Sequence, residues 1–321
     1  MPHRPLNERL TVVLLTYNCA RWIEPVLAHL RKLDVSIVAV DNASTDGTAE
    51  VVAAAGVRLI RMPHNVGAAA RNAGVRAVQT PYVAFCDDDD WYEPDGLPMA
   101  CDLLDRHPRL ALVNARIVVG PERHLDPISA EMADSPIVET AGIPGTVLMS
   151  FMAGACVVRV SAYREAGGYD RRFFLGGEEE TLSYTLLKRG WQLRYLPELV
   201  VAHYPSLANF TTLRAYGMRN TLWTAWLHRR FLNALRYTGF VLADAPKNGA
   251  YARAIAMTLR GLPWVLRERQ PMNRELDRDL RLLDARRFST RRSLFTFRDR
   301  GATRPASWQQ GGGGAPVGGP G

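Results

Sequence analysis

The first 90 residues alternate short apolar runs with amphipathic segments, and this alternation restricts the possible folds more than any other feature of the sequence. Four runs have the length and the β-branched content of strands: Leu10–Thr16, Val35–Val40, Val57–Arg61 and Tyr82–Cys86. The segments between them carry apolar residues at helical spacing, over 20–33, 46–55 and 68–79. Strands and helices that alternate over short connections predict a Rossmann-like α/β fold, in which helices flank a mostly parallel central sheet.

Polar residues stand directly after three of the four predicted strands. The first strand ends in Thr16-Tyr17-Asn18, the second runs into Asp41-Asn42, and the fourth into Asp87–Asp90. The carboxyl ends of parallel strands meet at one edge of a sheet, where ligands of such folds bind. We therefore expect the three clusters to converge on one ligand site, in which Asp41 can accept hydrogen bonds from a nucleotide base.

The run Asp87–Asp90 is the candidate metal site. Carboxylates so close repel one another, and each makes the others harder to ionise. A divalent cation relieves that cost, and Mg²⁺ or Mn²⁺ prefers carboxylate oxygen. A cation held here can also bind phosphate oxygens and neutralise a departing diphosphate. The alternative is an acidic loop that only contacts solvent.

Two further clusters belong near the same edge. Asp41–Gly47 supplies carboxylate and amide groups before a helix, and Asp46 has the position of its N-cap. Asn65-Val66-Gly67 precedes the helix that carries Arg71, and a helix N-terminus and an arginine both favour phosphate. Taken alone, Arg71 is equally well explained as a charge on the surface of a helix.

Together these clusters resemble the inverting glycosyltransferase family 2, which has the GT-A fold. The motifs that carry the resemblance are Thr16-Tyr17-Asn18, Asp41-Asn42-x-Ser44-x-Asp46-Gly47, Asn65-x-Gly67 with Arg71-Asn72, and Asp87-x-Asp89. The resemblance implies that Asp87 and Asp89 form the family's metal-associated Asp-x-Asp motif. It also implies a nucleotide-sugar site made of Thr16, Tyr17, Asn18, Asp41, Asn42, Ser44, Asn65, Gly67, Arg71 and Asp88.

A second stretch of resemblance includes the family's catalytic base. Residues 166–170 and 173–182 look like the segment that carries it. Family members commonly have Glu-Asp where this chain has Glu178-Glu179, so the resemblance implies Glu179 as the base and leaves Glu178 as the alternative. Thr181 and Thr185 stand where the family often has Asp and Arg, a departure that fits a distinct class of acceptor.

The signals for secondary structure are weaker from residue 91 to residue 205. The expected elements are a helix over 98–106, one or two strands within 110–119, a lid-like loop over 120–145, a buried strand over 147–160, helices over 161–166 and 178–189, and short strands over 193–196 and 199–203. The resemblance extends to about residue 205 and implies that His203 binds the metal or the diphosphate.

The C-terminal third differs in charge from the rest of the chain. Residues 1–210 carry 20 Lys and Arg against 25 Asp and Glu, whereas residues 211–321 carry 20 against 7. The sequence therefore divides into a catalytic region 1–210, a basic helical region 211–300 interrupted by Pro246, Pro263 and Pro271, and a disordered Gly/Pro-rich tail 301–321. The basic helices mix arginines with apolar residues. They either lie on an anionic membrane surface or bury their apolar faces on the catalytic region or in a homodimer.

These observations predict a metal-dependent glycosyltransferase with Mg²⁺ or Mn²⁺ as cofactor. It would move a sugar from a nucleotide-diphosphate donor to a hydroxyl of a glycan or lipid-linked acceptor, with inversion, in bacterial cell-envelope polysaccharide or glycolipid synthesis. The N-terminus lacks the apolar core of a signal peptide, and no run reaches the length of a membrane span. The expected location is the cytoplasm, with peripheral attachment to the inner face of the plasma membrane as an option.

Three other classes of protein fit less well. A sugar nucleotidyltransferase needs a Gly-rich basic loop after the first strand, and residues 16–21 contain no glycine. A P-loop NTPase needs the G-x-x-x-x-G-K-[ST] motif, which does not occur. A nucleotide-sugar-binding protein without turnover needs no acidic base, so the intact glutamates argue against it. We expect no nucleic-acid partner, because no RNP, zinc-finger or helix-turn-helix pattern accompanies the basic region.

Overall fold

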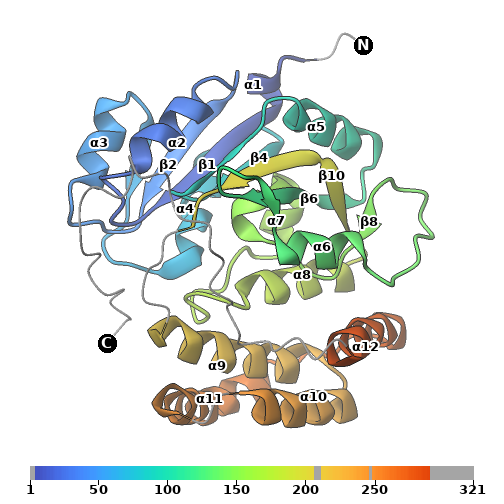
Figure 1. The fold of residues 1–321 in the computed structure, drawn as a ribbon. Helices are drawn as coiled ribbons and strands as arrows, with labels where there is room; N and C mark the ends of the chain where they lie inside the picture. Colours follow the sequence, from blue (N-terminus) through green and yellow to red (C-terminus); the bar gives the residue numbers. More distant parts are fainter. Residues whose placement is uncertain (1–3, 206–210, 246–247, 290–321) are drawn as a thin grey trace.

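The strands in the described part of the chain form one sheet flanked by helices (Figure 1). The computed structural model describes residues 4–205, 211–245 and 248–289. In chain order the strands of this part are β1 (Leu10–Thr16), β2 (Ser36–Asp41), β3 (Arg58–Arg61), β4 (Tyr82–Cys86), β5 (Asp90–Tyr92), β6 (Leu110–Val119), β7 (His124–Leu125), β8 (Thr146–Val147), β9 (Cys156–Arg159) and β10 (Gln192–His203). Across the sheet they run β3-β2-β1-β4-β9-β6-β10-β5, with β7 beside β6 and β8 beside β10.

The first four strands confirm the predicted parallel sheet. β1 pairs in parallel with β2 and β4, and β2 pairs in parallel with β3. The register sets Thr16 opposite Asp41 and Leu14 opposite Cys86, so the strands end together at one edge. Helices cover both faces, and alternate residues of β1 enter different cores: Leu14 packs in one and Val13 in the other.

The helices of this region mostly lie where the periodicity predicts them. They are α1 (Leu6–Arg9), α2 (Ile23–Leu30), α3 (Thr48–Ala54), the 3₁₀ turn η1 (Gly67–Ala70), α4 (Arg71–Ala77), α5 (Gly96–Arg106), α6 (Pro127–Ala133), the 3₁₀ turn η2 (Ala153–Ala155), α7 (Val160–Glu165) and α8 (Glu178–Lys188). The N-cap of α3 is Gly47 rather than Asp46. Asp46 instead accepts the first-turn N–H of Thr48 at 3.0 Å and the N–H of Ala20 at 3.0 Å, so it still satisfies the helix start.

The predicted loop over 120–145 and the predicted strand over 147–160 are each correct only in part: residues 134–145 form a loop, and β9 is the buried strand of the second segment. The first contains β7 and the short helix α6, which begins at Pro127 and is capped by Asp126, whose side chain accepts the Ile128 N–H at 2.8 Å. In the second, the chain leaves β8 and turns through η2 before β9, and the Met152 N–H is held by Asn114 Oδ1 at 2.7 Å.

The two strands predicted over 193–196 and 199–203 are parts of one strand, β10. Its parallel pairing with β6 shifts between Leu196 and Val200. Pro197 lies inside this shift and has no N–H to donate. The strand therefore continues past Pro197, but its hydrogen-bonding register with β6 changes there. β10 then carries His203 to the same edge of the sheet as Asp90, its partner on β5.

In the described residues after 210, four helices follow the sheet: α9 (Thr211–His228), α10 (Phe231–Asp244), α11 (Gly249–Arg267) and α12 (Arg274–Ser289). α9 packs on α8, and α10 and α11 lie on the side of α9 that faces away from the sheet (Figure 1). Pro271 separates α11 from α12 as predicted, whereas Pro263 lies inside α11 and does not interrupt it. Close packing maintains α11 there: a Cβ on Gly261 would lie 2.2 Å from the ring of Trp223.

Two predictions for the C-terminal part fall outside the described residues: the break at Pro246 and the disordered tail over 301–321. Within the ranges that are described, no helix combines the length and the apolar composition needed to cross a lipid bilayer.

Candidate active site

The ends of β1 and β2 form one side of the candidate site. Thr16 and Asp41 lie opposite each other and are fully buried. Oδ2 of Asp41 accepts a hydrogen bond from the Ser44 N–H at 3.2 Å and lies 3.5 Å from Nε of Arg61. Oδ1 of Asp41 is buried without a hydrogen-bond partner among the described residues. Because buried polar atoms are nearly always paired, this oxygen is available to a ligand donor.

Four of the predicted nucleotide-binding residues hold the surrounding loops together. The Asn18 N–H donates to Ser44 Oγ at 3.0 Å, and Asn18 Oδ1 accepts the Thr45 N–H at 2.9 Å. The side-chain amide of Asn42 donates to Asn65 Oδ1 at 2.9 Å. These contacts fix the loops after β1, β2 and β3 against one another, so the four residues set the shape of the site.

Gly67 joins this part of the site to the segment before α8. Its φ is +62°, and a Cβ at this position would lie 1.9 Å from the carbonyl oxygen of Phe174. The N–H of Ala68 donates to the same oxygen at 2.8 Å. Only glycine accommodates both the left-handed backbone and this close approach. Gly67 therefore positions the chain that leads to Glu178 and Glu179.

Arg71 is the charged residue at the centre of the site. It is 2% exposed, which excludes the alternative that it is a charge on the helix surface. Its guanidinium contacts the Asp87 carboxylate and also interacts electrostatically with Glu178 and Glu179. Burial lowers the pKa of Arg71, but the charges of Asp87 and the other acidic groups raise it by a larger amount. The net pKa of Arg71 is therefore raised, and the guanidinium stays charged. Nε of Arg71 is buried with no hydrogen-bond partner among the described residues.

The four aspartates after β4 are crowded. Oδ2 of Asp87 and Oδ2 of Asp90 approach Gly154 of η2, where a Cβ would lie 2.6 Å and 2.4 Å from them. Burial, together with the charges of Asp89 and Asp87, raises the pKa of Asp88 to about 7. Burial also raises the pKa of Asp87 and of Asp90. A bound cation would relieve this electrostatic cost. Gly154 is a site residue that no motif indicates, and its role follows only from this contact.

Asp89, in the turn between β4 and β5, lies close to His203 at the end of β10. Nε2 of His203 lies 3.7 Å from Oδ1 of Asp89. Burial lowers the pKa of His203, but the Asp89 carboxylate more than offsets that effect, so the net pKa is raised. Asp88 lies on the other side, where its Oδ2 is 3.4 Å from the Tyr17 N–H.

The side chains at this edge of the sheet suit Mg²⁺ or Mn²⁺ if a substrate supplies further oxygen ligands. Within the described ranges, no group of three or more His, Cys, Asp or Glu side chains is arranged so that it could hold a metal ion by itself. Mg²⁺ is usually held by one or two carboxylates, while substrate phosphates and water fill the other positions. Asp87, Asp89 and His203 supply two carboxylates and one imidazole, so they would hold such a cation only together with phosphate oxygens of a substrate and water.

α8 begins at the two predicted candidates for the base. Gly176 and Gly177 have φ of +82° and +84°, and these left-handed residues turn the chain into the helix. Glu178 is buried, and its Oε2 has no hydrogen-bond partner in the described part of the chain, whereas Glu179 is half-buried. Burial raises the pKa of both carboxyls, and the Glu179 charge raises that of Glu178 further. Such carboxylates bind a proton more strongly than in water, which suits a general base.

Two residues of α9 hold the segment before α8, although no motif indicates them. The Asn220 amide donates to the carbonyl oxygens of Phe173 at 2.7 Å and Leu175 at 3.0 Å, and Arg219 donates to those of Arg172 at 3.0 Å and Phe173 at 2.9 Å. Both are buried. Two adjacent polar residues in a helix rich in apolar residues are a visible signal, but the sequence does not say what they bind.

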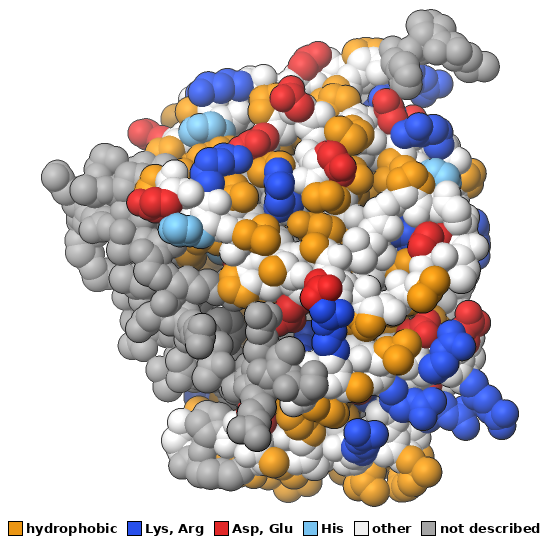
Figure 2. Space-filling model, turned by 45° about the vertical axis from the view of Figure 1, so that its right-hand side comes forward, with side chains coloured by type: hydrophobic (Ala, Val, Ile, Leu, Met, Phe, Trp, Pro, Cys, Tyr) orange, Lys and Arg blue, Asp and Glu red, His pale blue; other side chains and the backbone are white. Residues whose placement is uncertain are grey.

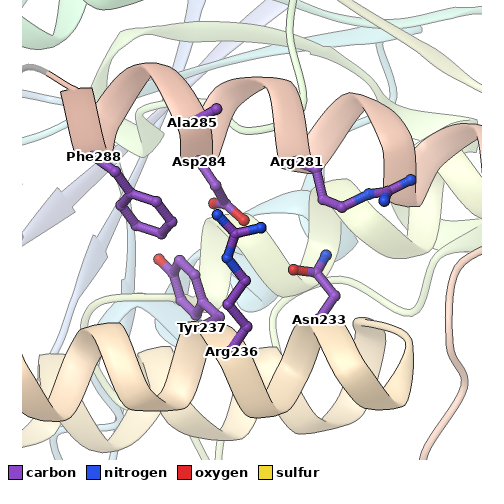
Figure 3. A pocket seen from close by; sticks show the side chains of 7 residues that line it. All are labelled: Asn233, Arg236, Tyr237, Arg281, Asp284, Ala285 and Phe288. Atoms are coloured by element: carbon purple, nitrogen blue, oxygen red, sulfur yellow. The ribbon is translucent and has the colours of Figure 1, made fainter.

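A small pocket lies in the C-terminal helices, between α10 and α12 (Figure 3). It is lined by Asn233, Arg236, Tyr237, Arg281, Asp284, Ala285 and Phe288. None of these residues comes from the strand ends, so the pocket is separate from the candidate active site.

The sheet and its flanking helices have the GT-A fold. A solved structure of a mannosyltransferase from Pyrobaculum calidifontis, in complex with GDP-Man and Mn²⁺, matches this fold with a TM-score of 0.54 at 19% identity, over 91% of this chain and 89% of that one. Residues 11–167, just under half of the chain, match the model of glycosyl transferase family 2. Both findings confirm the resemblance that the motifs indicate.

Two relatives from Mycobacterium tuberculosis are similar in sequence. A pre-mycofactocin glycosyltransferase is 32% identical over 213 residues, which are 63% of this chain and 44% of that protein. An N-acetylglucosaminyl-diphospho-decaprenol L-rhamnosyltransferase is 26% identical over 241 residues, covering 62% of this chain and 77% of that protein. The chain thus spans less than half the length of the first of these relatives.

Proposed function

We propose that the protein transfers a sugar from a nucleotide-diphosphate donor to a hydroxyl of a glycan or lipid-linked acceptor, with inversion at the anomeric carbon. One observation carries this proposal: buried Arg71 contacts Asp87 and interacts with Glu178 and Glu179, so the acidic run and the candidate bases share one guanidinium. The similarity to a rhamnosyltransferase that acts on a decaprenol-linked sugar supports a role in bacterial cell-envelope glycan synthesis.

The residues divide into three roles. Oδ1 of Asp41 accepts hydrogen bonds from the base, and Thr16, Tyr17 and the braced loops enclose the nucleotide. Asp87, Asp89 and His203 would hold Mg²⁺ or Mn²⁺, which when bound neutralises charge on the diphosphate. Asp88 accepts a hydrogen bond from the Tyr17 N–H and so connects this acidic cluster to the loop after β1.

Glu179 removes the proton in the transfer step. The acceptor oxygen attacks the anomeric carbon while its proton passes to the Glu179 carboxylate. The bond from that carbon to the diphosphate oxygen breaks, and its electron pair leaves with the nucleotide diphosphate. A single displacement inverts the anomeric configuration without a covalent intermediate on the protein.

The test separates binding from turnover. Nucleoside diphosphates and nucleotide sugars are screened with Mg²⁺ or Mn²⁺ by thermal shift, because ligands of the folded state raise its apparent stability. The best donor is then assayed for transfer with Glu179→Gln, and with Glu180→Gln as the control of equal charge change. We expect the first variant to bind donor and lose most turnover, while the control keeps it. Activity in Glu179→Gln with loss in Glu178→Gln would move the base by one residue.

A non-catalytic nucleotide-sugar-binding protein is distinguished by the same experiment, since it would show the thermal shift without any transfer by the unaltered chain.

We further propose that the protein works in the cytoplasm, and that α9 acts with the catalytic region predicted over 1–210. The hydrogen bonds of Asn220 and Arg219 to the segment before α8 support this extension.

A further inference from the structure

Helix α11 presents an outward stripe made only of apolar residues. The stripe residues are Ala252, Ala256, Leu259, Pro263 and Leu266, all exposed and spaced three or four apart. The opposite face of α11, which includes Ala254 and Val265, is buried. α11 therefore has one apolar face packed in the protein and a second apolar face exposed to solvent, which is not expected of a helix that meets only water.

Helix α10 has a similar exposed face. Leu232 is 78% exposed, and Phe231 and Leu235 are also largely exposed, while Tyr237 and Val241 on the other face are buried. α10 and α11 both pack on α9, on its side away from the sheet (Figure 1). Their outward stripes thus belong to one surface of the molecule, which we call the α10–α11 face.

Arginines border this face. Arg253, Arg260 and Arg267 recur every seven residues along α11, next to the apolar stripe, and all three are exposed. Arg236 of α10 is also exposed, but it points toward α12 and lines the pocket there (Figure 3). Between residues 231 and 267 the sequence contains one acidic residue, Asp244. In Figure 2, blue side chains stand beside orange ones along the lower edge of the molecule, where the C-terminal helices lie.

We propose that the α10–α11 face binds the interface of an anionic lipid bilayer. The apolar stripe can insert among the lipid acyl chains, while the arginines beside it contact the anionic headgroups. Each basic residue near an anionic leaflet strengthens binding about fivefold. A second copy of the chain fits less well, because two such faces in contact would bring rows of arginines together. The inference does not rest on the proposed function, since binding to lipid needs no turnover.

The test is flotation of the full chain with vesicles. Vesicles of phosphatidylcholine alone are compared with vesicles of equal parts phosphatidylcholine and phosphatidylglycerol. The double variant Leu232→Asp, Leu259→Asp changes two largely exposed residues of the face. The matched control is Leu125→Asp, Val138→Asp, which changes two exposed apolar residues outside the C-terminal helices. Circular dichroism melts check that each variant is folded.

We expect the unaltered chain and the control to float with the anionic vesicles only, and to be released as salt rises. The partition coefficient of the Leu232→Asp, Leu259→Asp variant should fall at least about tenfold. If that variant does not fold, Arg253→Gln, Arg260→Gln is used, and its partition coefficient should fall about fivefold per arginine. Failure of the unaltered chain to bind anionic vesicles, or full binding by a folded variant of this face, overturns the proposal. A dimer in sedimentation velocity that the leucine variant abolishes would assign the face to a second copy instead.

Discussion

At the scale of single residues, buried polar atoms without partners point to ligands more directly than the motifs do. The motifs place Thr16, Asp41 and Asp87 at one edge, and the structure confirms that they meet there. What the sequence could not predict is which atoms are already paired. Asn18 and Asn42 look like ligand contacts, yet their hydrogen bonds go to neighbouring loops. Pairing depends on the final distances between segments far apart in the chain.

Asp41 gives the first prediction. Replacing Asp41 with Asn keeps the size of the side chain but removes the negative charge and half of its acceptor capacity. We expect the Kd for the best nucleoside diphosphate to rise about tenfold or more, since a hydrogen bond to a charged group contributes about 1.5–3 kcal/mol. Isothermal titration calorimetry measures this. Asp34→Asn, which changes an exposed carboxylate, should bind normally, and equal affinity in both variants would remove Asp41 from the base site.

The pH dependence of transfer gives the second prediction. Burial raises the pKa of Glu179, and a general base works only when it is ionised. Activity should therefore fall as pH decreases through this raised pKa, so the acid limb of kcat/KM lies above the ordinary glutamate value of about 4.3. A profile of kcat/KM against pH for the unaltered chain tests it. A rate that stays constant down to about pH 4.3 would contradict the assignment.

At the scale of elements, local pattern predicts strands and helices well and their long-range partners poorly. β1 and β4 have the predicted bounds, because a short β-branched run carries its own signal. The place of β9 between β4 and β6 has no local signal, since it depends on pairing with strands about forty and seventy residues earlier. The hydrogen bonds from α9 to the segment before α8 also have no local signal, because they join residues 45 or more apart in the sequence.

This hold gives the third prediction. Asn220→Asp replaces the amide donor with an acceptor that repels the carbonyl oxygens of Phe173 and Leu175. We expect kcat to fall at least about tenfold while KM for the donor changes little, because Asn220 positions the segment before Glu179 and does not touch the donor site. Steady-state kinetics measure the two constants. Thr221→Ala on the same helix is the control, and an equal fall in both variants would indicate a general effect on α9.

At the scale of the whole molecule, α9 connects the sheet to the C-terminal helices. Phe173 is fully buried and its ring centroid lies 6.0 Å from that of Trp223 of α9, which in turn packs on Trp264 of α11. Arg172 adds an ion pair with Glu268 at 2.8 Å. The charge balance predicts a boundary near residue 210, but charge reports composition and not which surfaces pack together. That boundary stays a prediction.

Removal of the C-terminal helices gives the fourth prediction. A chain that ends at residue 210 leaves Phe173 without the cover of Trp223, and losing one large aromatic from a core costs about 3–5 kcal/mol. We expect the midpoint of thermal unfolding to fall by about 10 °C or more. Differential scanning calorimetry measures the midpoint, with a chain ended at residue 300 as the control. An unchanged midpoint in the shorter chain would mean that the catalytic region is independent.

One side of α9 binds the segment before Glu179, and the other side packs on α10 and α11. Chimeras between related chains are therefore constrained in where the two sequences can be joined. A chimera that takes α10–α12 from a relative, but keeps this chain's α9, must have a glycine at the position of Gly261, because a Cβ there would lie 2.2 Å from the ring of Trp223. A chimera that takes α9 as well must supply its own Asn220 and Arg219 to the native segment over 172–176. α9 thus connects the segment before Glu179 to the outer helices, and compatible exchanges would have to replace residues 172–176 and α9 together.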